Sequence, residues 1–229
     1  GLNAAITIQE KHPSKKVIIA ERGTLPTGAS TKNAGFSCFG SVSELIDDLK
    51  GQSEDLVWSV LEKRWLGLQR LKQRIGTESM DYFQHGNFEV FGEQDQALYQ
   101  ACQAHIAPFN RKIEAITGVK NTFATAHEKI KDFGLDHSQQ LIWNQSEGQI
   151  NTGKMMQQLL KLAREKGIEI YNGLSIEAIE ETAHCVQVKT TQGWSFQSQQ
   201  VIVATNGFAQ QLLPNLAIKP VRNETATTE

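Results

Sequence analysis

The sequence predicts an α/β fold that combines a parallel sheet with an antiparallel β-meander. Two short runs, at residues 16–21 and 201–204, have uninterrupted apolar centres, as in parallel strands that are buried on both faces. Residues 2–11 precede the first run and place leucine and isoleucine at helical spacing. Several short β-like segments between residues 168 and 197 follow one another closely, which is typical of a meander.

Composition and charge exclude several classes of protein. The chain has 229 residues, of which 39% are hydrophobic, and this supports a sizeable core. Its net charge of −2 without a basic block argues against a nucleic-acid partner. Its longest apolar runs are far shorter than the roughly 20 residues of a membrane helix, so we expect no transmembrane segment. Three scattered cysteines and dispersed histidines predict a reduced, cytoplasmic protein without disulfides or a metal site.

The remaining elements are predicted from hydrophobic periodicity and from breaker residues. Residues 22–43 are rich in Gly, Ser, Thr and Asn and are expected to form a long functional loop. Residues 120–146 show no clear pattern. A helical pattern is predicted over 43–75, with a second hydrophobic stripe after Gly51, and helices are predicted over 93–117 with an interruption at Pro108 and over 154–166. Strands are predicted over 82–91, with a possible turn at Gly86–Asn87, and over 168–170, 175–180, 184–190 and 193–197.

A spacing near the start of the chain carries the first functional signal. Gly1 opens the first predicted helix, and Glu21 ends the following strand 20 residues later. In a dinucleotide-binding βαβ unit, the helix N-terminus binds the pyrophosphate and an acidic residue about 20 positions on accepts the ribose hydroxyls. Here the first strand and the first two glycines of the G-x-G-x-x-G fingerprint are absent. A solvated strand-end carboxylate is the alternative interpretation of Glu21.

The next segment favours the nucleotide interpretation. Gly28–Gly35 contains the pattern G-x-S-x-x-N-x-G and resembles the loop of the FAD-dependent amino acid and amine oxidoreductases, the D-amino acid oxidase-like family. Glu147–Asn151 resembles that family's E-G-x-I-x-P segment, with Thr152 where proline is common. Val201–Gly207 resembles the strand and turn near the adenosine, and Lys219–Arg222 resembles the P-x-R that leads back to the substrate domain.

The resemblance implies FAD as the cofactor and a Rossmann-like FAD-binding domain with an inserted α+β substrate domain, incomplete in this chain. Family members are longer, so we expect truncation at both ends. The expected organisation is a first part of the FAD-binding domain at 1–75, part of the substrate domain at 76–146, a second part of the FAD-binding domain at 147–218, and the return into the substrate domain at 219–229.

The resemblance also implies which residues contact the cofactor. Phe36–Phe39 is expected beside the isoalloxazine ring. Cys38 is interpreted as a plain buried cysteine, with a free thiol near the flavin as the alternative, and His85 as a turn residue, with a place near a substrate cavity as the alternative. No catalytic residue is identified, and no arginine is singled out for a substrate carboxylate. The expected cofactor contacts are Gly1, Glu21, Arg22, Gly28, Ala29, Ser30, Thr31, Lys32, Asn33, Ala34, Gly35, Ile176, Ala204, Thr205, Asn206 and Gly207.

The implied reaction is oxidation of the C–N bond of an amino acid or secondary amine. A hydride passes from the substrate to flavin N5, and water hydrolyses the resulting imine. The alternatives are another two-domain flavoprotein, of the glycerol-3-phosphate dehydrogenase or tRNA-modifying type, and a non-catalytic fragment without cofactor. A nicotinamide-only dehydrogenase fits the meander less well. The partner is therefore expected to be a small-molecule amine or amino acid, and the sequence leaves the identity of the substrate, the electron acceptor and the oligomeric state open.

Overall fold

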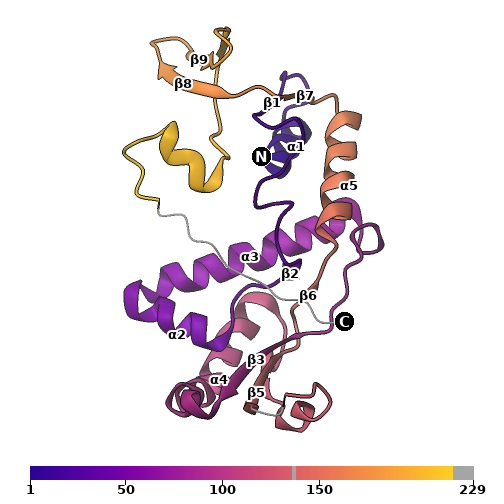
Figure 1. The fold of residues 1–229 in the computed structure, drawn as a ribbon, viewed down its shortest axis with the longest axis vertical. Coiled ribbons are helices and arrows are strands. Elements are labelled where there is room, and N and C mark those ends of the chain that lie inside the picture. Colours follow the sequence, from indigo (N-terminus) through magenta and orange to yellow (C-terminus); the bar gives the residue numbers. More distant parts are fainter. Residues whose placement is uncertain (136–137, 219–229) are drawn as a thin grey trace. The chain divides into compact units, whose positions relative to one another are not determined.

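The computed structural model describes residues 1–135 and 138–218, and its elements fall into two units (Figure 1). The first unit comprises residues 1–34 and 156–218, and the second comprises residues 35–155. The helices between residues 42 and 75 share a hydrophobic core with the helix and strands that follow them. The domain divisions predicted after residues 75, 146 and 218 stay a prediction. Residues 219–229 lie outside the described residues.

The first unit is built on a pair of parallel strands, β1 and β7, with Ile19 opposite Ile170. Gly167 adopts a positive φ of 76° and ends the helix before β7, as the sequence predicted. The predicted meander is present, with β9 between β8 and β10 and both pairings antiparallel. The elements are α1 (Leu2–Lys11), β1 (Ile18–Glu21), α5 (Thr152–Glu165), which continues from the second unit, β7 (Glu169–Asn172), β8 (Ile176–Glu181), β9 (Val186–Thr190), β10 (Ser195–Ser198) and the 3-10 helix η4 (Asn206–Gln211).

Two predictions about the first unit were wrong. Strand β1 is not buried on both faces, because its side chains alternate between exposed and half-buried and the described residues supply only β7 as a neighbour. Residues 201–204 do not form a strand, and Ile202 is 60% exposed. A strand is held by the ladder of hydrogen bonds to a neighbour, and none of the described strands pairs with these residues.

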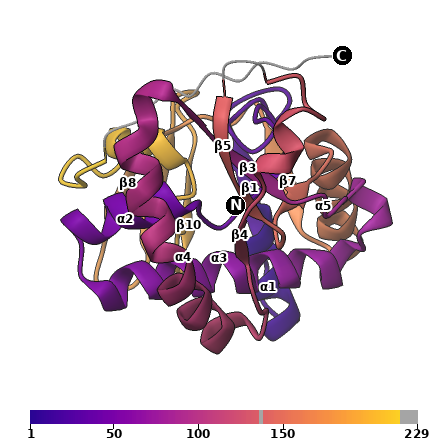
Figure 2. The same ribbon diagram turned by 90° about the horizontal axis from the view of Figure 1, so that it is seen from below.

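The second unit is an α+β arrangement of three helices and two small antiparallel sheets (Figures 1 and 2). One sheet has the order β3-β5-β4, and the other consists of β2 and β6. The core joins the helices to the larger sheet through residues such as Leu61, Ile113 and Phe91. The elements are β2 (Phe36–Ser37), α2 (Val42–Gly51), α3 (Glu54–Ile75), η1 (Glu78–Met80), β3 (Asn87–Gly92), η2 (Glu93–Asp95), α4 (Gln96–Thr117), β4 (Phe123–Thr125), η3 (His127–Ile130), β5 (Ser138–Asn144) and β6 (Gly148–Gln149).

Local rules explain where these helices differ from the prediction. The helical pattern expected over 43–75 forms two helices. Ser41 caps the start of α2 in a capping box, and α2 ends where the chain becomes extended at Gln52, before α3 begins. Helix α4 is not interrupted at Pro108. Proline removes one backbone hydrogen bond, but the buried residues Cys102 and Phe109 hold the turns on either side.

The narrow β2–β6 sheet depends on glycine at Gly35. Gly35 adopts a φ of 76°, its carbonyl accepts the N–H of Ile150 at 2.8 Å, and an added Cβ would overlap the Ile150 carbonyl oxygen. Only glycine satisfies both requirements without strain. In the strand region predicted over 82–91, the possible turn at Gly86–Asn87 is present: Gly86 has a φ of 82°, and β3 begins one residue later.

We predict that Gly35→Ala destabilises the protein by about 2 kcal/mol or more, because it combines a positive φ with a backbone overlap. Gly67→Ala is the matched control. Gly67 lies inside α3 with nothing within 4 Å of an added Cβ, so this change is expected to stabilise by about 0.5–1 kcal/mol. Urea unfolding of both variants checks the prediction, and equal stabilities would contradict it.

Candidate functional site

The carboxyl end of β1 brings together several of the predicted site residues of the first unit. The Glu21 side chain accepts a hydrogen bond from the Gly23 N–H at 2.9 Å. The guanidinium carbon of Arg22 lies 4.1 Å from the centre of the Phe208 ring, which is a cation–π contact. Phe208 belongs to η4, so the end of β1 is joined to the turn that carries Asn206 and Gly207.

The N-terminus of α1 meets the same turn. An added Cβ at Gly1 would lie 3.9 Å from the Ala204 Cβ, and Ala204 is followed by Thr205 and η4. Gly1 is the N-cap of α1, and no described side chain caps this helix end. The first backbone N–H groups of α1 are therefore the kind of donors that bind a phosphate.

The loop after β1 is ordered by its own backbone. The N–H groups of Thr31 and Lys32 both donate to the Gly28 carbonyl, at 3.0 and 3.1 Å. The Thr31 hydroxyl also donates to Gly28, and the Asn33 amide donates to Ala29 at 2.9 Å. Thr31 and Asn33 thus shape the loop in this conformation, while Gly28, Ala29, Ser30, Lys32 and Ala34 are exposed on it.

Ile176 is connected to this site through the backbone. The N–H of Leu174 donates to the Glu21 carbonyl at 2.9 Å, and the N–H of Gly173 donates to the Gly23 carbonyl at 2.9 Å. Ile176 follows two residues later as the first residue of β8. The end of β1, the start of the meander and the turn at Ala204 are therefore linked within one unit.

These residues suit a dinucleotide. Glu21 is half-buried, and a carboxylate at a strand end can accept the two hydroxyl hydrogens of a ribose. The helix N-terminus supplies donors and a favourable dipole for a pyrophosphate. The exposed glycine and alanine residues of the loop let a ligand approach the backbone closely. The donor and acceptor groups present thus fit the adenosine diphosphate half of a flavin cofactor.

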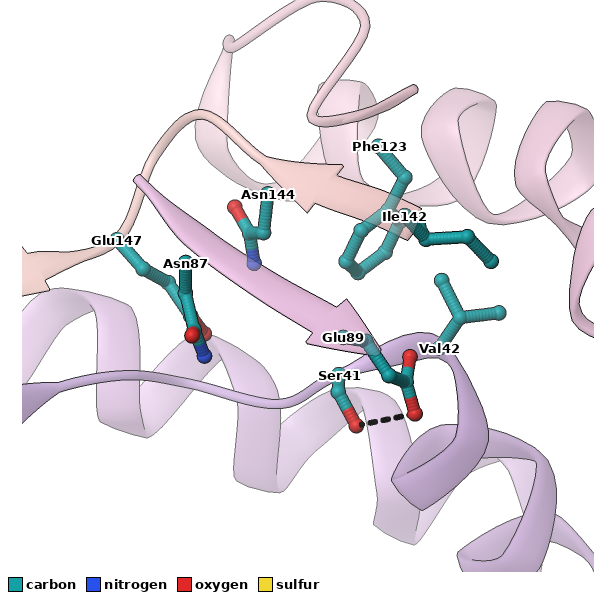
Figure 3. Close-up of a pocket in the computed structure, with 8 residues that line it drawn as sticks. All are labelled: Ser41, Val42, Asn87, Glu89, Phe123, Ile142, Asn144 and Glu147. Carbon is teal, nitrogen blue, oxygen red and sulfur yellow. Dashed lines mark hydrogen bonds between the residues drawn. The ribbon is translucent and has the colours of Figure 1, made fainter. Parts of the chain in front are cut away.

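The second unit contains a buried carboxylate that sequence reasoning noticed only as part of a motif. Glu147 is 1% exposed, and it accepts hydrogen bonds from the backbone N–H of Phe39 at 2.8 Å, the backbone N–H of Gly40 at 3.2 Å and the side-chain amide of Asn87 at 3.0 Å. Figure 3 shows the side chains of Glu147 and Asn87 directed toward one another. The sequence signal available for this carboxylate was Glu147 itself, an acidic residue directly before Gly148 of the short strand β6.

Glu147 lines a small pocket of the second unit, in which polar and apolar side chains meet (Figure 3). Within it, the Ser41 hydroxyl donates to the Glu89 carboxylate at 3.4 Å. The side-chain nitrogen of Asn144 is buried and has no hydrogen-bond partner among the described residues. Burial raises the pKa of the Glu147 carboxyl, although its three donors act in the opposite direction. The lining residues are Ser41, Val42, Asn87, Glu89, Phe123, Ile142, Asn144 and Glu147.

Cys38 differs from its prediction, because it is exposed and not buried. Side chains alternate across a strand, and Ser37 and Phe39 take the buried positions on either side of it. All three cysteines are free. Within residues 1–135 and 138–218, no group of three or more His, Cys, Asp or Glu side chains is arranged to hold a metal. The same residues contain no helix with the length and apolar character needed to cross a bilayer.

Comparison with known proteins gives the class of this chain. The family model described as FAD dependent oxidoreductase matches residues 1–229. The chain therefore belongs to the FAD-dependent oxidoreductase family, whose cofactor is FAD. The predicted family, its cofactor and the α/β fold with a parallel sheet are confirmed by this match and by similar solved structures.

The individual similar proteins share a low sequence identity with this chain. A segment of 82 residues is 29% identical to the "Bifunctional protein ThiO/ThiG" of Synechocystis sp., covering 36% of this chain and 12% of that protein. Glycine oxidase from Geobacillus kaustophilus matches with a TM-score of 0.63 at 17% identity, and the match covers 92% of this chain and 54% of the glycine oxidase chain. L-Amino acid deaminase from Proteus myxofaciens matches with a TM-score of 0.70 at 16% identity, and the match covers 96% of this chain and 46% of the deaminase chain. The chain thus spans about half the length of these solved structures.

We predict that Glu147→Ala destabilises the protein by about 2–5 kcal/mol, because two buried backbone N–H groups lose their acceptor. Glu147→Gln keeps one acceptor oxygen and is expected to destabilise less. Glu62→Ala, an exposed glutamate of α3, is the control and should stay within about 0.5 kcal/mol of the parent. Urea unfolding measures all three, and a neutral Glu147→Ala would contradict the role of the carboxylate.

The same residue predicts a pH dependence. Burial raises the folded-state pKa of Glu147 above the ordinary value of a glutamate, so the folded state binds the proton of this carboxyl more tightly than the unfolded state does. The stability of the parent relative to Glu147→Gln should be greatest below the ordinary glutamate pKa and should fall as pH rises through the raised value. Unfolding free energies of both proteins from about pH 4 to about pH 8 test this. A difference that grows with pH would contradict it.

Proposed function

We propose that this chain carries the adenosine-binding half of a flavin site in an enzyme that oxidises the C–N bond of an amino acid or secondary amine. The observation that carries the proposal is the meeting of three features at the end of β1. These are the Glu21 carboxylate, the N-terminus of α1 against Ala204, and the Arg22–Phe208 contact beside the turn at Asn206. Dinucleotide binding combines a strand-end acidic residue for the ribose with a helix N-terminus for the pyrophosphate, and the Arg22–Phe208 contact holds the turn at Asn206 beside them.

The residues are assigned by their chemistry. Glu21 accepts the ribose hydroxyls, and the N–H groups that follow Gly1 bind the pyrophosphate. Exposed backbone between Gly28 and Gly35 approaches the phosphates and the flavin edge, and Ile176 and residues 204–207 border the adenosine. When bound, FAD would supply a hydride acceptor for oxidation of the substrate C–N bond to an imine, which water would hydrolyse. The chain's own part in this chemistry is to bind, to orient and to exclude water.

The substrate class is supported by the chemistry in the names of the similar structures. Those names include glycine oxidase, L-amino acid deaminase and an iminodiacetate oxidase from Chelativorans sp. BNC1, the last with a TM-score of 0.67 at 17% identity. Glycine, L-amino acids and iminodiacetate all carry an amine one carbon from a carboxylate. We propose the same class for this protein, and a reducing, cytoplasmic location in keeping with its three free cysteines.

The first experiment is the absorption spectrum of the purified protein before and after denaturation. Flavin bands that appear in the released fraction after denaturation are expected, because the proposed contacts are non-covalent. Added FAD that neither binds nor changes its spectrum would overturn the assignment of these residues.

We predict that Glu21→Gln weakens FAD binding about tenfold to a hundredfold, because hydrogen bonds from the ribose to a charged carboxylate are each stronger than those to an amide. The amide oxygen still accepts the Gly23 N–H, so the loop should keep its shape. Glu177→Ala, an exposed carboxylate of β8, is the control and should leave the affinity unchanged. Titration of the FAD-free protein with FAD, followed by flavin fluorescence, gives the three dissociation constants. Equal affinities of the parent and Glu21→Gln would contradict the role of Glu21.

A further inference from the structure

The pocket in Figure 3 lies over one face of the β3-β5-β4 sheet of the second unit. Asn144 of the central strand β5 is opposite Asn87 of β3 and opposite Phe123 of β4. Residues that are directly opposite one another in antiparallel strands project to the same face of the sheet. Ile142 comes two residues before Asn144 and projects to this face as well, and it is opposite Glu89 of β3. The sheet therefore supplies most of the residues that line the pocket.

The pocket has a buried floor and a less buried rim. Two polar side chains belong to the floor, since Asn144 is 4% exposed and Glu147 is 1% exposed. The apolar part of the floor is also buried and consists of Val42, Phe123 and Ile142. The remaining lining residues are half-buried and are Ser41, Asn87 and Glu89. Bulk water is therefore kept from the floor, and a polar group there has to be satisfied from within the pocket.

The Asn144 amide carries a donor that the described residues leave unsatisfied. Its oxygen accepts the backbone N–H of Ser146 at 3.0 Å, whereas its nitrogen is buried and has no hydrogen-bond partner among the described residues. The bond from Ser146 fixes the orientation of the amide, because the opposite orientation would place two donors against each other. Figure 3 shows the nitrogen directed from β5 toward the other lining side chains. The pocket thus contains a fixed donor that requires an acceptor.

The Glu147 carboxylate has capacity for one more donor. Its Oε1 atom accepts the N–H groups of Phe39 and Gly40, and its Oε2 atom accepts the Asn87 amide. Each carboxylate oxygen has two lone pairs. The Oε2 atom can therefore accept a further hydrogen bond from a molecule inside the pocket. A bound molecule can thus be held by the Asn144 donor on one side and by this acceptor on the other.

The lining residues select the chemistry of that molecule. It has to accept a hydrogen bond from Asn144 and donate one to Glu147. A metal cation or an ammonium ion has no lone pair for the Asn144 donor, and an anion is repelled by the carboxylates of Glu89 and Glu147. Water both accepts and donates. The cavity has a volume of about 10 Å³, which is room for about one water molecule.

We propose that this pocket binds one water molecule, which accepts a hydrogen bond from the Asn144 amide and donates one to the Glu147 carboxylate. Its second hydrogen has acceptors at the rim, in the Ser41 hydroxyl and the Glu89 carboxylate. Buried waters with two to four polar partners are part of the structure and are costly to remove. This inference goes beyond the proposed function and does not depend on it, because every residue of the site belongs to the second unit.

The first test is a nuclear magnetic resonance measurement on the isotopically labelled parent protein. Cross-relaxation between water and the side-chain amide hydrogens is recorded in the laboratory frame and in the rotating frame, because a long-lived bound water gives opposite signs in the two. We expect opposite signs at the amide hydrogens of Asn144. The exposed Asn172 of β7 is the internal control, and its amide should show no long-lived water. A parent in which Asn144 behaves like Asn172 would overturn the proposal.

A pair of variants tests whether Asn144 holds the water. Asn144→Leu removes the donor at similar volume, so the water is expected to disappear from the electron density of a high-resolution crystal structure. Thr122→Val is the matched control, because the Thr122 hydroxyl is also buried without a partner among the described residues but does not line the pocket. The water should remain in this variant. Its persistence in Asn144→Leu would contradict the role of Asn144, and the measurement on the parent decides the question if Asn144→Leu does not fold.

A separate measurement distinguishes water from a cation of similar size. Crystals of the parent are soaked in thallous acetate, because thallous ions replace potassium and ammonium ions and are located by their anomalous scattering. We expect no anomalous peak in the pocket, since the Asn144 nitrogen presents hydrogens to whatever binds there. A peak between Asn144 and Glu147 would show a cation site and would overturn the assignment of water.

Discussion

The Glu147 carboxylate is the interaction on which the second unit depends. It accepts hydrogen bonds from Phe39 and Gly40, which follow β2, and from Asn87 at the start of β3. Its own backbone carbonyl accepts the N–H of Gly86 at 3.0 Å. One buried group thus ties together three segments that are far apart in the sequence. A buried acceptor satisfied by several donors has a single low-energy arrangement, because each donor left unpaired costs free energy.

Close backbone contacts at two glycines also hold this part of the second unit together. Strand β6 lies between β2 and the Phe83 segment, and an added Cβ at Gly148 would overlap the Phe83 carbonyl oxygen. With Gly35 equally tight against Ile150, glycines fix both sides of this narrow sheet. Phe39 is buried, whereas Phe36 and Phe83 are exposed.

In the first unit, the local sequence pattern predicted some elements correctly and others incorrectly. The spacing from Gly1 to Glu21 and the apolar centre of β1 predicted a helix and a strand, and both are present. The same reasoning failed at residues 201–204, whose apolar run has no partner strand among the described residues. An apolar run records a preference for the extended state, but a strand exists only where a neighbour completes its hydrogen bonds. The contact of Arg22 with Phe208 carried no sequence signal, since the two residues are 186 positions apart.

The sequence by itself determined the family, the cofactor, the order of the helices and the meander, because these rest on periodicity, breaker residues and motifs within short windows. Tertiary structure decided the rest. It divided the units after residues 34 and 155, kept α4 continuous through Pro108, exposed Cys38 and gave the buried Glu147 its donors. Each of these depends on which distant segments pack together. Burial and hydrogen-bond partners are properties of that packing, whereas a local pattern specifies only the element that is to be packed.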